Sequence, residues 1–331
     1  MINSPRKLFR NFLIILVIIL LIITGFVVFG IIERKKQEED LVQSKIDTDK
    51  LNQYYYKGNY YVLNEDIQTI LCVGLDSYEN NISDSYRNNE LADCIVLLAL
   101  DKTNKTVLPI QINRDTMCNY NVLGIGGKIT NSAFGQIAFS HSYGSGDIQS
   151  LVNVKDAVSD LFCNIRIDNY ISITMNAVAK INDTAGGVKV YVEDDFSAVD
   201  PSLIQGQEVL LLGDHALNFV RARQGLDDSS NINRLNRQRV YLRSLYDVCS
   251  DKVNEDNGFV RNCLESVSEY LIANTNIYGL SDIGNTLLEY DLLDAVQLQG
   301  EAKNGDVYIE FYPNEEVLEE FCINNFYKKV K

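Results

Sequence analysis

The sequence is poor in the residues on which several classes of protein depend. Among 331 residues it has four prolines and 20 glycines, and 46% of the residues are hydrophobic, which excludes a collagen-like or disordered chain. Only two histidines are present, His141 and His215, so a serine–histidine–aspartate triad has few candidates. The seven cysteines include no C-x-x-C pair, and a structural zinc site is therefore not expected.

Two glycine-rich segments also lack residues that a catalytic motif requires. In the segment 124–128 (GIGGK), Val122 stands where a P-loop has its first glycine, and Ile129 replaces the serine or threonine after the lysine. The segment 144–146 (GSG) does not match the G-x-S-x-G pattern of a hydrolase nucleophile. Neither segment therefore supports a nucleotide site or a hydrolase site.

Positive charge is scarce and unevenly placed. The chain has 30 basic and 45 acidic residues and a net charge of −15, an excess of acid that argues against binding to nucleic acid. Residues 1–36 hold six basic residues and one acidic residue, which leaves 24 basic and 44 acidic residues, a net charge of −20, for the rest. A strongly acidic body thus follows a basic, apolar head.

The head contains a long hydrophobic run. Residues 12–32 are 21 apolar or small residues, with Thr24 as the only polar one. A helix of this length spans about 31 Å, which matches the roughly 30 Å hydrocarbon core of a bilayer. Charged residues follow Ile32 directly, without the small-residue cleavage site of a signal peptide. We therefore predict an uncleaved, single-pass transmembrane helix in the cell membrane.

The residues around this run set its predicted orientation. Three basic residues precede the run and three follow it, but acidic residues after residue 32 dilute the positive charge on that side. We predict that residues 1–11 form a cytoplasmic tail, residues 33–61 a polar stalk, and residues 62–331 an extracytoplasmic domain.

Three short apolar segments lie near the start of this domain. Residues 69–75 and 94–100 are apolar on both faces, which is typical of central strands covered on two sides. A polar turn at 101–105 leads to a third candidate strand, 106–113, in which Pro109 indicates an edge or a bulge. The three segments predict an antiparallel meander.

Helical and strand patterns follow this meander to the C-terminus. The spacing of apolar residues predicts helices over residues 148–162, 175–185, 213–220, 234–248, 263–273, 286–295 and 315–326. It predicts further strands over residues 169–174, 188–192 and 307–311. The expected fold class is mixed α/β, with a central, mostly antiparallel sheet flanked by helices on both faces.

Charged residues stand where the three strands of the meander meet at one edge. Asp76 follows the first strand, Asp93 precedes the second, and Arg114 follows the third. Mg²⁺ binds one or two carboxylates and completes its coordination with water and phosphate oxygens. The edge is therefore a candidate seat for a divalent cation and a phosphate. The alternative is that each aspartate only caps a strand end or turn.

A second group of basic residues lies downstream. Arg234, Arg237 and Gln238 are spaced i, i+3, i+4 and share one face of the predicted helix, and Arg221 and Arg223 precede it. Guanidinium groups suit bidentate contact with phosphate better than ammonium groups do. The segment predicts a phosphate-binding group or, alternatively, an ordinary solvated helix face.

These residues lie in segments that resemble the LytR–CpsA–Psr family of cell-wall glycopolymer transferases. The resemblance runs from about residue 66 to 248 and rests on VGLDS (73–77), ADCIVLLAL (92–100), INRDTM (112–117), DNYISI (168–173), AGGVKV (185–190), ALNFVRAR (216–223) and NRLNRQR (233–239). The order and spacing of these segments agree with the family, and so does the amino-terminal anchor.

The resemblance implies an anchored, extracytoplasmic enzyme that moves a glycopolymer from a polyprenyl-diphosphate carrier to a peptidoglycan hydroxyl, with Mg²⁺ (or Mn²⁺) at the diphosphate. The lipid tail is expected in an apolar pocket between sheet and helices. The implied partners are the carrier-linked glycan, peptidoglycan and the membrane, with no nucleic acid.

The resemblance also assigns roles by position. The metal ligands correspond to Asp76 and Asp93, and the diphosphate-binding group to Arg114, Arg221, Arg223, Arg234 and Gln238. In the mechanism that we expect, the acceptor hydroxyl loses its proton to Asp93, or to Asp115 beside Arg114.

The sequence departs from the family at two places. Leu91 and Ala92 stand where the family commonly has Arg-Ser, and Asn231 stands where it has an aspartate. One cationic contact and one candidate base are therefore missing. The alternative function is a polyprenyl-diphosphate-binding protein or cell-envelope regulator that has lost the chemistry, and a further alternative is an anchored partner-binding module.

Overall fold

The computed structural model describes residues 35, 53–82, 86–222, 225–226 and 231–330. The predicted transmembrane helix, the cytoplasmic tail and Arg223 lie outside these residues. Among them, no helix combines the length and the apolar character that crossing a membrane requires. The chain divides into two compact units, Met1–Leu63 with Lys328–Lys331, and Asn64–Tyr327.

The described part of the first unit is a small antiparallel sheet. Strand β1 (Tyr54–Tyr56) pairs with β2 (Asn59–Leu63) across a tight turn in which Lys57 and Gly58 both have positive φ angles. Two positive φ angles in succession give a turn whose twist matches that of paired strands. The end of the predicted stalk therefore forms a hairpin.

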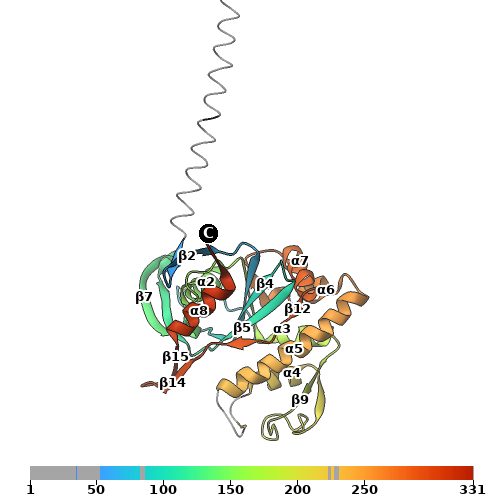
Figure 1. Cartoon of the computed structure of the whole chain (residues 1–331). Coiled ribbons are helices and arrows are strands. Elements are labelled where there is room, and N and C mark those ends of the chain that lie inside the picture. Colours follow the sequence, from blue (N-terminus) through green and yellow to red (C-terminus); the bar gives the residue numbers. More distant parts are fainter. Residues whose placement is uncertain (1–34, 36–52, 83–85, 223–224, 227–230, 331) are drawn as a thin grey trace, which may run out of the picture. The chain divides into compact units, whose positions relative to one another are not determined.

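The second unit is built on a seven-stranded mixed sheet (Figure 1). Its strands are β3 (Ile67–Leu75), β4 (Ala92–Asp101), β5 (Thr106–Ile112), β8 (Asn169–Ile173), β11 (Leu271–Ala273), β12 (Asp291–Leu292) and β13 (Val296–Gln297). The sequence predicted the antiparallel meander β3–β4–β5, and the structure confirms it.

Most paired residues of the sheet are antiparallel, as predicted, but the sheet also has parallel pairs that the sequence did not predict. Strand β8 is parallel to β3, and both β12 and β13 are parallel to β5, while β11 is antiparallel to β8. Parallel neighbours need long crossover connections, which here contain helices. The residues of β3, β4 and β5 do not indicate which later segments complete the sheet.

Helices flank both faces of this sheet, as predicted. Helix α2 (Ile148–Leu161) lies on one side, and α3 (Met175–Thr184), α5 (Asn231–Glu255), α6 (Phe259–Ser266) and α7 (Ile277–Leu288) lie on the other (Figure 1). Residues of β3 and β4 that alternate along the strands, such as Leu71 and Leu97, are fully buried. Their neighbours, such as Cys72 and Leu98, line a cavity on the opposite face.

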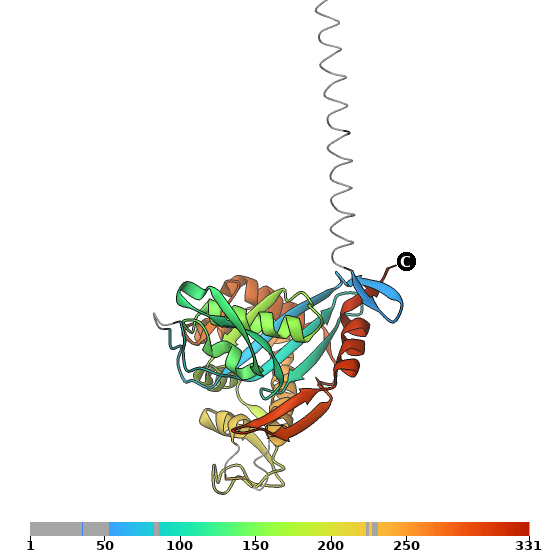
Figure 2. The ribbon, with the colours of Figure 1, turned by 90° about the vertical axis from the view of Figure 1, so that its left-hand side faces the viewer.

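Further elements extend the second unit beyond the sheet (Figure 2). They are the hairpin β6 (Met117–Leu123) with β7 (Ile129–Gln136), the short helical segment η2 (Ile137–Ser142), the pair β9 (Val188–Tyr191) with β10 (Glu208–Leu211), helix α4 (Asp214–Arg221), the hairpin β14 (Gly300–Asn304) with β15 (Ile309–Pro313), and helix α8 (Glu315–Phe326). The patterns did not predict the β6–β7 hairpin.

Two predicted helices are wrong in extent. In the segment 263–273, the helix ends at Ser266. Residues 271–273 form strand β11, because they pair with β8 at the edge of the sheet. Helix α7 starts at Ile277, where the Asn276 side chain accepts a hydrogen bond from the Gly279 amide, and it stops at Leu288. Residues 289–295 instead pass along β5, since pairing to an exposed edge outweighs local helical spacing.

Candidate active site

A β-bulge sets the position of Asp93. Gly74 pairs with Cys94 and Leu75 with Ala92, so Asp93 is an extra residue with no partner in the register. A β-carbon on Gly74 would lie 3.0 Å from the Cys94 β-carbon, which explains why the close approach of the strands needs glycine. A bulge bends its strand and turns a side chain out of the regular alternation. It here turns Asp93 into the cavity at the end of β4.

Two arginines from distant segments meet this carboxylate. Arg114, which follows β5, pairs with Oδ1 of Asp93, and Nη1 of Arg234 on α5 lies 3.1 Å from Oδ2. The side chains of Arg114 and Arg234 are only 11% and 3% exposed. Two buried guanidinium groups from distant segments thus converge on one carboxylate, and such groups can also bind phosphate oxygens.

Asp76 stands at the same edge of the sheet. It follows Leu75, which pairs with Ala92, and its backbone amide donates to the Leu91 carbonyl at 3.3 Å. Its Oδ1 accepts a hydrogen bond from the Leu91 amide at 2.9 Å. The backbone of Leu91 thus holds Asp76 whatever the side chain at position 91. The predicted meeting of Asp76, Asp93 and Arg114 at one edge agrees with this geometry.

Buried polar residues lie behind Asp76. Oε1 of Glu90 accepts hydrogen bonds from Ser77 Oγ at 2.8 Å and from the Asn81 amide at 3.1 Å. Nδ1 of His141 lies 3.9 Å from Glu90 Oε2, and His141 is fully buried. Among the described residues neither ring nitrogen of His141 has a hydrogen-bond partner. Burial lowers the pKa of His141 to about 4.

This pKa predicts how stability depends on pH. Between pH 6.5 and 4 the unfolded chain binds a proton at His141 that the folded chain excludes, so stability falls as the pH falls. We expect the free energy of unfolding to drop by about 2 kcal/mol more between pH 7 and pH 5 in the wild type than in His141→Gln. Urea unfolding at the two pH values measures this difference, and equal drops in both proteins contradict it.

The C-terminal end of α4 presents Arg221. Its Nη1 donates to the Tyr78 hydroxyl at 2.9 Å, and its guanidinium group lies 5.6 Å from the centre of that ring. Gln238 on α5 donates from Nε2 to the Val220 carbonyl at 3.3 Å. These contacts place Arg221 and Gln238 next to each other, although 17 residues separate them in the sequence.

Arg237 has a role that its spacing did not reveal. The sequence grouped it with Arg234 and Gln238, but it turns toward α4 and away from Asp93. Its Nε donates to the Phe219 carbonyl at 3.0 Å, and its Nη1 bonds Asp194 Oδ2 at 2.6 Å. A cation suits the carbonyl groups at a helix C-terminus. Arg237 therefore anchors the end of α4 and so positions Arg221.

Four of these residues line one small cavity of about 70 Å³: Asp93, Arg221, Arg234 and Gln238. Gln238 Oε1 is buried and has no hydrogen-bond partner among the described residues. The predicted phosphate-binding residues, apart from Arg114 and the undescribed Arg223, thus surround a common space. Arg114 does not line this cavity, but it pairs with Asp93, which does.

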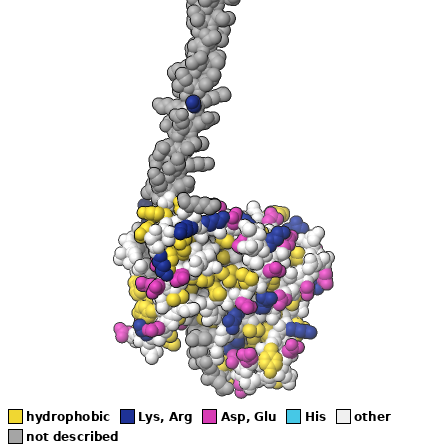
Figure 3. Space-filling view, in the orientation of Figure 1, with side chains coloured by type: hydrophobic (Ala, Val, Ile, Leu, Met, Phe, Trp, Pro, Cys, Tyr) yellow, Lys and Arg dark blue, Asp and Glu magenta, His cyan; other side chains and the backbone are white. Residues whose placement is uncertain are grey.

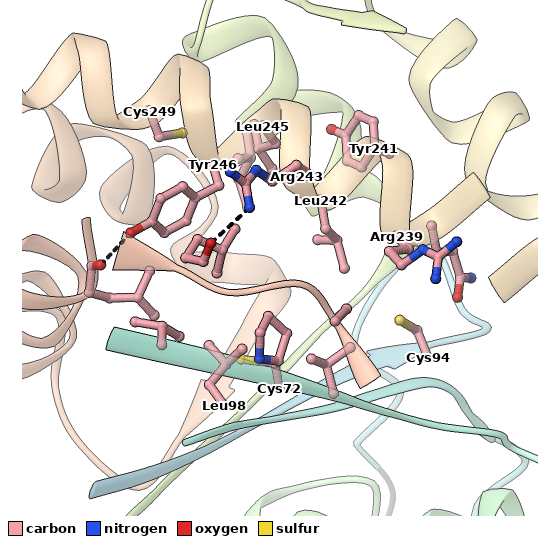
Figure 4. Close-up of a pocket in the computed structure, with 18 of the residues that line it drawn as sticks. Cys72, Cys94, Leu98, Arg239, Tyr241, Leu242, Arg243, Leu245, Tyr246 and Cys249 are labelled. Atoms are coloured by element: carbon pink, nitrogen blue, oxygen red, sulfur yellow. Dashed lines mark hydrogen bonds between the residues drawn. The ribbon is translucent and has the colours of Figure 1, made fainter. Parts of the chain in front are cut away.

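A large apolar cavity adjoins the small one. It has a volume of about 990 Å³ and lies between the sheet and helices α3, α5, α6 and α7 (Figure 4). Gly74, Cys94 and Gln238 line both cavities. Hydrophobic side chains gather in the middle of the face that Figure 3 shows, over the sheet and α5. The two cavities together suit a ligand with an anionic head and a long apolar tail.

The polar groups at the wall of the large cavity include two thiols and two hydrogen-bonded side chains, and Arg239 and Asp294 also line it. Burial raises the pKa of the Cys72 thiol to about 12 and that of the Cys94 thiol to about 11, so both stay protonated. Arg243 donates to the Leu292 carbonyl at 2.8 Å, and the Tyr246 hydroxyl donates to the Leu287 carbonyl at 2.7 Å (Figure 4). These bonds tie the segment after α7 to α5 and close that side of the cavity.

Asp115 faces away from the small cavity. Its Oδ1 accepts a hydrogen bond from Gln136 Nε2 at 3.1 Å and lies 3.7 Å from Arg114 Nε. The side chain of Asp115 is 11% exposed, compared with 20% for Asp93. Of the two candidate bases, only Asp93 lines the space in which Arg221 and Arg234 meet.

The carboxylates at the edge of the sheet are the candidate ligands of a divalent cation. Within the described residues, no group of three or more histidine, cysteine, aspartate or glutamate side chains could hold a metal ion. Asp93 lines the small cavity, and Asp76 stands at the same edge of the sheet. This donor set fits Mg²⁺, which takes only one or two carboxylates and completes its shell with phosphate oxygens and water.

The fold and site define a mixed α/β protein with a small arginine-lined cavity beside a large apolar one. Residues 26–324 match the model of the LytR_cpsA_psr family, and the chain belongs to this family. The resemblance noted in the sequence is thereby confirmed.

Curated relatives are 28% identical to the chain over the part that they match. The polyisoprenyl-teichoic acid–peptidoglycan teichoic acid transferase TagU of Halalkalibacterium halodurans is 28% identical over 181 residues, which cover 55% of this chain and 53% of TagU. The transferase TagV of Bacillus subtilis is 28% identical over 192 residues, 56% of this chain and 44% of TagV. The chain thus spans about half the length of the curated relatives it matches.

Solved structures show the same fold. B. subtilis TagV aligns with a TM-score of 0.59 and 21% identity, over 80% of this chain and 98% of that one. The protein gbs0355 of Streptococcus agalactiae aligns with a TM-score of 0.63 and 18% identity, over 80% and 91% of the two chains. A structure of TagT bound to LI-WTA aligns with a TM-score of 0.59 and 19% identity, over 79% and 91%.

Proposed function

We propose that this protein transfers a glycopolymer from a polyprenyl-diphosphate carrier to a hydroxyl group of peptidoglycan. The observation that carries the proposal is the junction of the two cavities. A cluster of arginines around Asp93 stands at the entrance of an apolar space of about 990 Å³. An anionic head on a long hydrocarbon chain has the matching chemistry, and relatives named as teichoic acid transferases support this substrate class.

The arginines act on the diphosphate by binding and charge neutralisation. Arg234 and Arg114 already hold the Asp93 carboxylate, and Arg221 and Gln238 complete the small cavity. A diphosphate placed there meets guanidinium donors from two separate segments, α4 and α5. Preorganised donors of this kind stabilise the charge that develops on phosphoryl oxygens during transfer.

Asp76 and Asp93 would hold a Mg²⁺ (or Mn²⁺) ion. When bound, such an ion neutralises charge on the diphosphate oxygens. The backbone clamp of Leu91 on Asp76 and the bulge at Asp93 keep both carboxylates at the same edge of the sheet.

In the proposed reaction, the acceptor hydroxyl oxygen bonds to the phosphorus that carries the glycan. The bond from this phosphorus to the polyprenyl phosphate breaks, and the leaving group takes the electron pair while Arg221 and Arg234 face its charge. The hydroxyl proton passes to a carboxylate. Asp93 is better placed than Asp115 to receive it, because Asp93 lines the small cavity.

The proposed location follows from the substrates. We place residues 12–32 in the cell membrane and the body on the extracytoplasmic side, where peptidoglycan lies. This arrangement gives the cavity access to a carrier lipid whose tail resides in the same membrane.

A specific observation favours a second candidate, a binding protein without transferase activity. Leu91 replaces an arginine of the family pattern, and it contributes only backbone groups to Asp76. The residues proposed to bind the diphosphate are therefore present, although one arginine of the family pattern is missing. Such a protein would bind the carrier-linked glycan and act as a cell-envelope regulator.

One assay separates the two candidates. The purified full chain, kept in detergent, is incubated with a lipid-diphosphate glycan, peptidoglycan and Mg²⁺. We expect glycan to become covalently attached to peptidoglycan with release of the lipid monophosphate. Binding of the lipid without any release of lipid monophosphate would instead select the binding protein, and the absence of binding would exclude both.

A further inference from the structure

A group of exposed aromatic and aliphatic side chains lies at one end of the second unit. Phe134 on β7 is 60% exposed, and Tyr308 and Ile309 at the β14–β15 turn are 58% and 51% exposed. The rings of Tyr308 and Phe139 are 5.9 Å apart. We call these four residues the aromatic face. Exposed apolar groups that gather in this way are typical of interaction sites.

One glutamine joins the two hairpins that carry this face. Gln136 follows Phe134 by two residues on β7 and therefore shares its side of the strand. Its Nε2 donates to the Ile309 carbonyl at 2.7 Å and to Asp115 Oδ1 at 3.1 Å. The Asp115 carbonyl in turn accepts a hydrogen bond from the Phe311 amide at 2.9 Å. The aromatic face thus begins at Asp115, next to Arg114, and is continuous with the candidate active site.

The face and the large cavity lie on opposite sides of the sheet. Figures 1 and 2 show β7, β14 and β15 on the side of α2, whereas α6 and α7, which line the cavity, lie on the other side. In phosphoryl transfer the attacking and leaving oxygens are roughly in line across the phosphorus. With the leaving polyprenyl phosphate directed into the cavity, the acceptor approaches from the side of the aromatic face.

The composition of the β6–β7 hairpin indicates what this acceptor is. Lys128 is the only charged residue between positions 117 and 136, in a chain with 23% charged residues. Asn119, Asn131 and Ser132 are exposed there and offer uncharged hydrogen-bonding groups. The β14–β15 hairpin adds acidic groups at Asp306 and Glu310. Aromatic rings beside amide, hydroxyl and carboxylate groups suit a sugar, which has apolar ring faces and hydroxyl edges. A membrane surface would instead favour basic side chains.

From this geometry we propose that the aromatic face binds an N-acetylated glycan strand and directs it past Asp115 and Arg114 toward the small cavity, where Asp93 faces its hydroxyl group. Tyr308 and Phe134 stack on sugar rings and thereby hold the strand. This inference rests on the proposed transferase function and assigns the acceptor its own site.

The test uses the full chain in detergent and two probes. Binding of a soluble N-acetylglucosamine tetrasaccharide and of farnesyl diphosphate is measured separately by titration calorimetry. Tyr308→Ala and Phe134→Ala are each expected to weaken tetrasaccharide binding about tenfold, the loss of one stacked ring, and to leave farnesyl diphosphate binding unchanged. The matched control is Tyr278→Ala, because Tyr278 on α7 is 67% exposed and lies outside the face.

Each outcome decides a different statement. Tetrasaccharide binding that is equal in the wild type and both variants, or absent from the wild type, overturns the glycan site. Dimerisation that Tyr308→Ala abolishes assigns the face to a second copy of the chain and also overturns it. Ring-dependent tetrasaccharide binding without binding of farnesyl diphosphate supports the glycan site and contradicts the proposed transferase.

Discussion

Replacing Arg234 by alanine is expected to lower the rate of glycopolymer transfer at least about a hundredfold, the usual cost of removing one preorganised donor to a developing charge. Arg234 is buried and pairs with Asp93 from the first turns of α5, where the helix dipole also favours an anion. Its loss removes a charge from the diphosphate seat and releases one oxygen of Asp93. The measurement is the initial rate of glycan attachment to peptidoglycan.

Two further variants show whether this loss is chemical or structural. Arg234→Lys keeps a charge but not the planar fork, and we expect it to recover only part of the rate. Arg261→Ala removes a half-exposed arginine on α6, and we expect no change. A folded Arg234→Ala protein with the rate of the wild type would exclude this residue from the site.

Filling the large cavity is expected to have the second largest effect. Cys72 lies in the middle of β3 and lines the cavity, so Cys72→Trp places an indole ring where we expect the lipid tail. We expect the affinity for a polyprenyl-diphosphate substrate to fall about thirtyfold or more, because several buried methylene groups lose their apolar surroundings at about 0.8 kcal/mol each. Calorimetric titration measures this affinity.

The control for this prediction is the length of the lipid. Cys72→Ala leaves the cavity open and is expected to bind like the wild type. A diphosphate with a chain of only five carbons has little tail to lose, and we expect Cys72→Trp to bind it normally. Equal weakening for short and long chains would place the tail elsewhere, and unchanged binding of both would remove the cavity from the proposed function.

The departures from the family pattern affect the two candidate functions differently. The backbone of Leu91 fixes Asp76, so the absence of an arginine side chain at this position costs a cation without disturbing the carboxylate. The side chain of Asn231 lies outside the described residues. The transfer assay therefore decides between transferase and binding protein, since the seat itself is present in both.

Much of the central sheet was predictable because its strands carry the signal locally. Segments 69–75, 94–100 and 106–113 are apolar and separated by turn residues, and they form β3, β4 and β5 within two residues of the predicted ends. The same alternation placed Asp76, Asp93 and Arg114 at one edge. Helix α3 ends for an equally local reason, since Gly186 and Gly187 after it both have positive φ angles.

The sequence alone determined the meander, the acidic and arginine-rich segments and the family resemblance, because each depends on residues that are close along the chain. Only the tertiary structure decided which arginines face Asp93. Arg234 reaches it across 141 residues, whereas Arg237, three positions away, turns to the end of α4. The tertiary structure also determined the cavity, the bulge at Asp93 and the aromatic face, because these form where distant segments pack together. Helical spacing predicts which residues share one face of a helix, but it does not predict which other segment packs against that face.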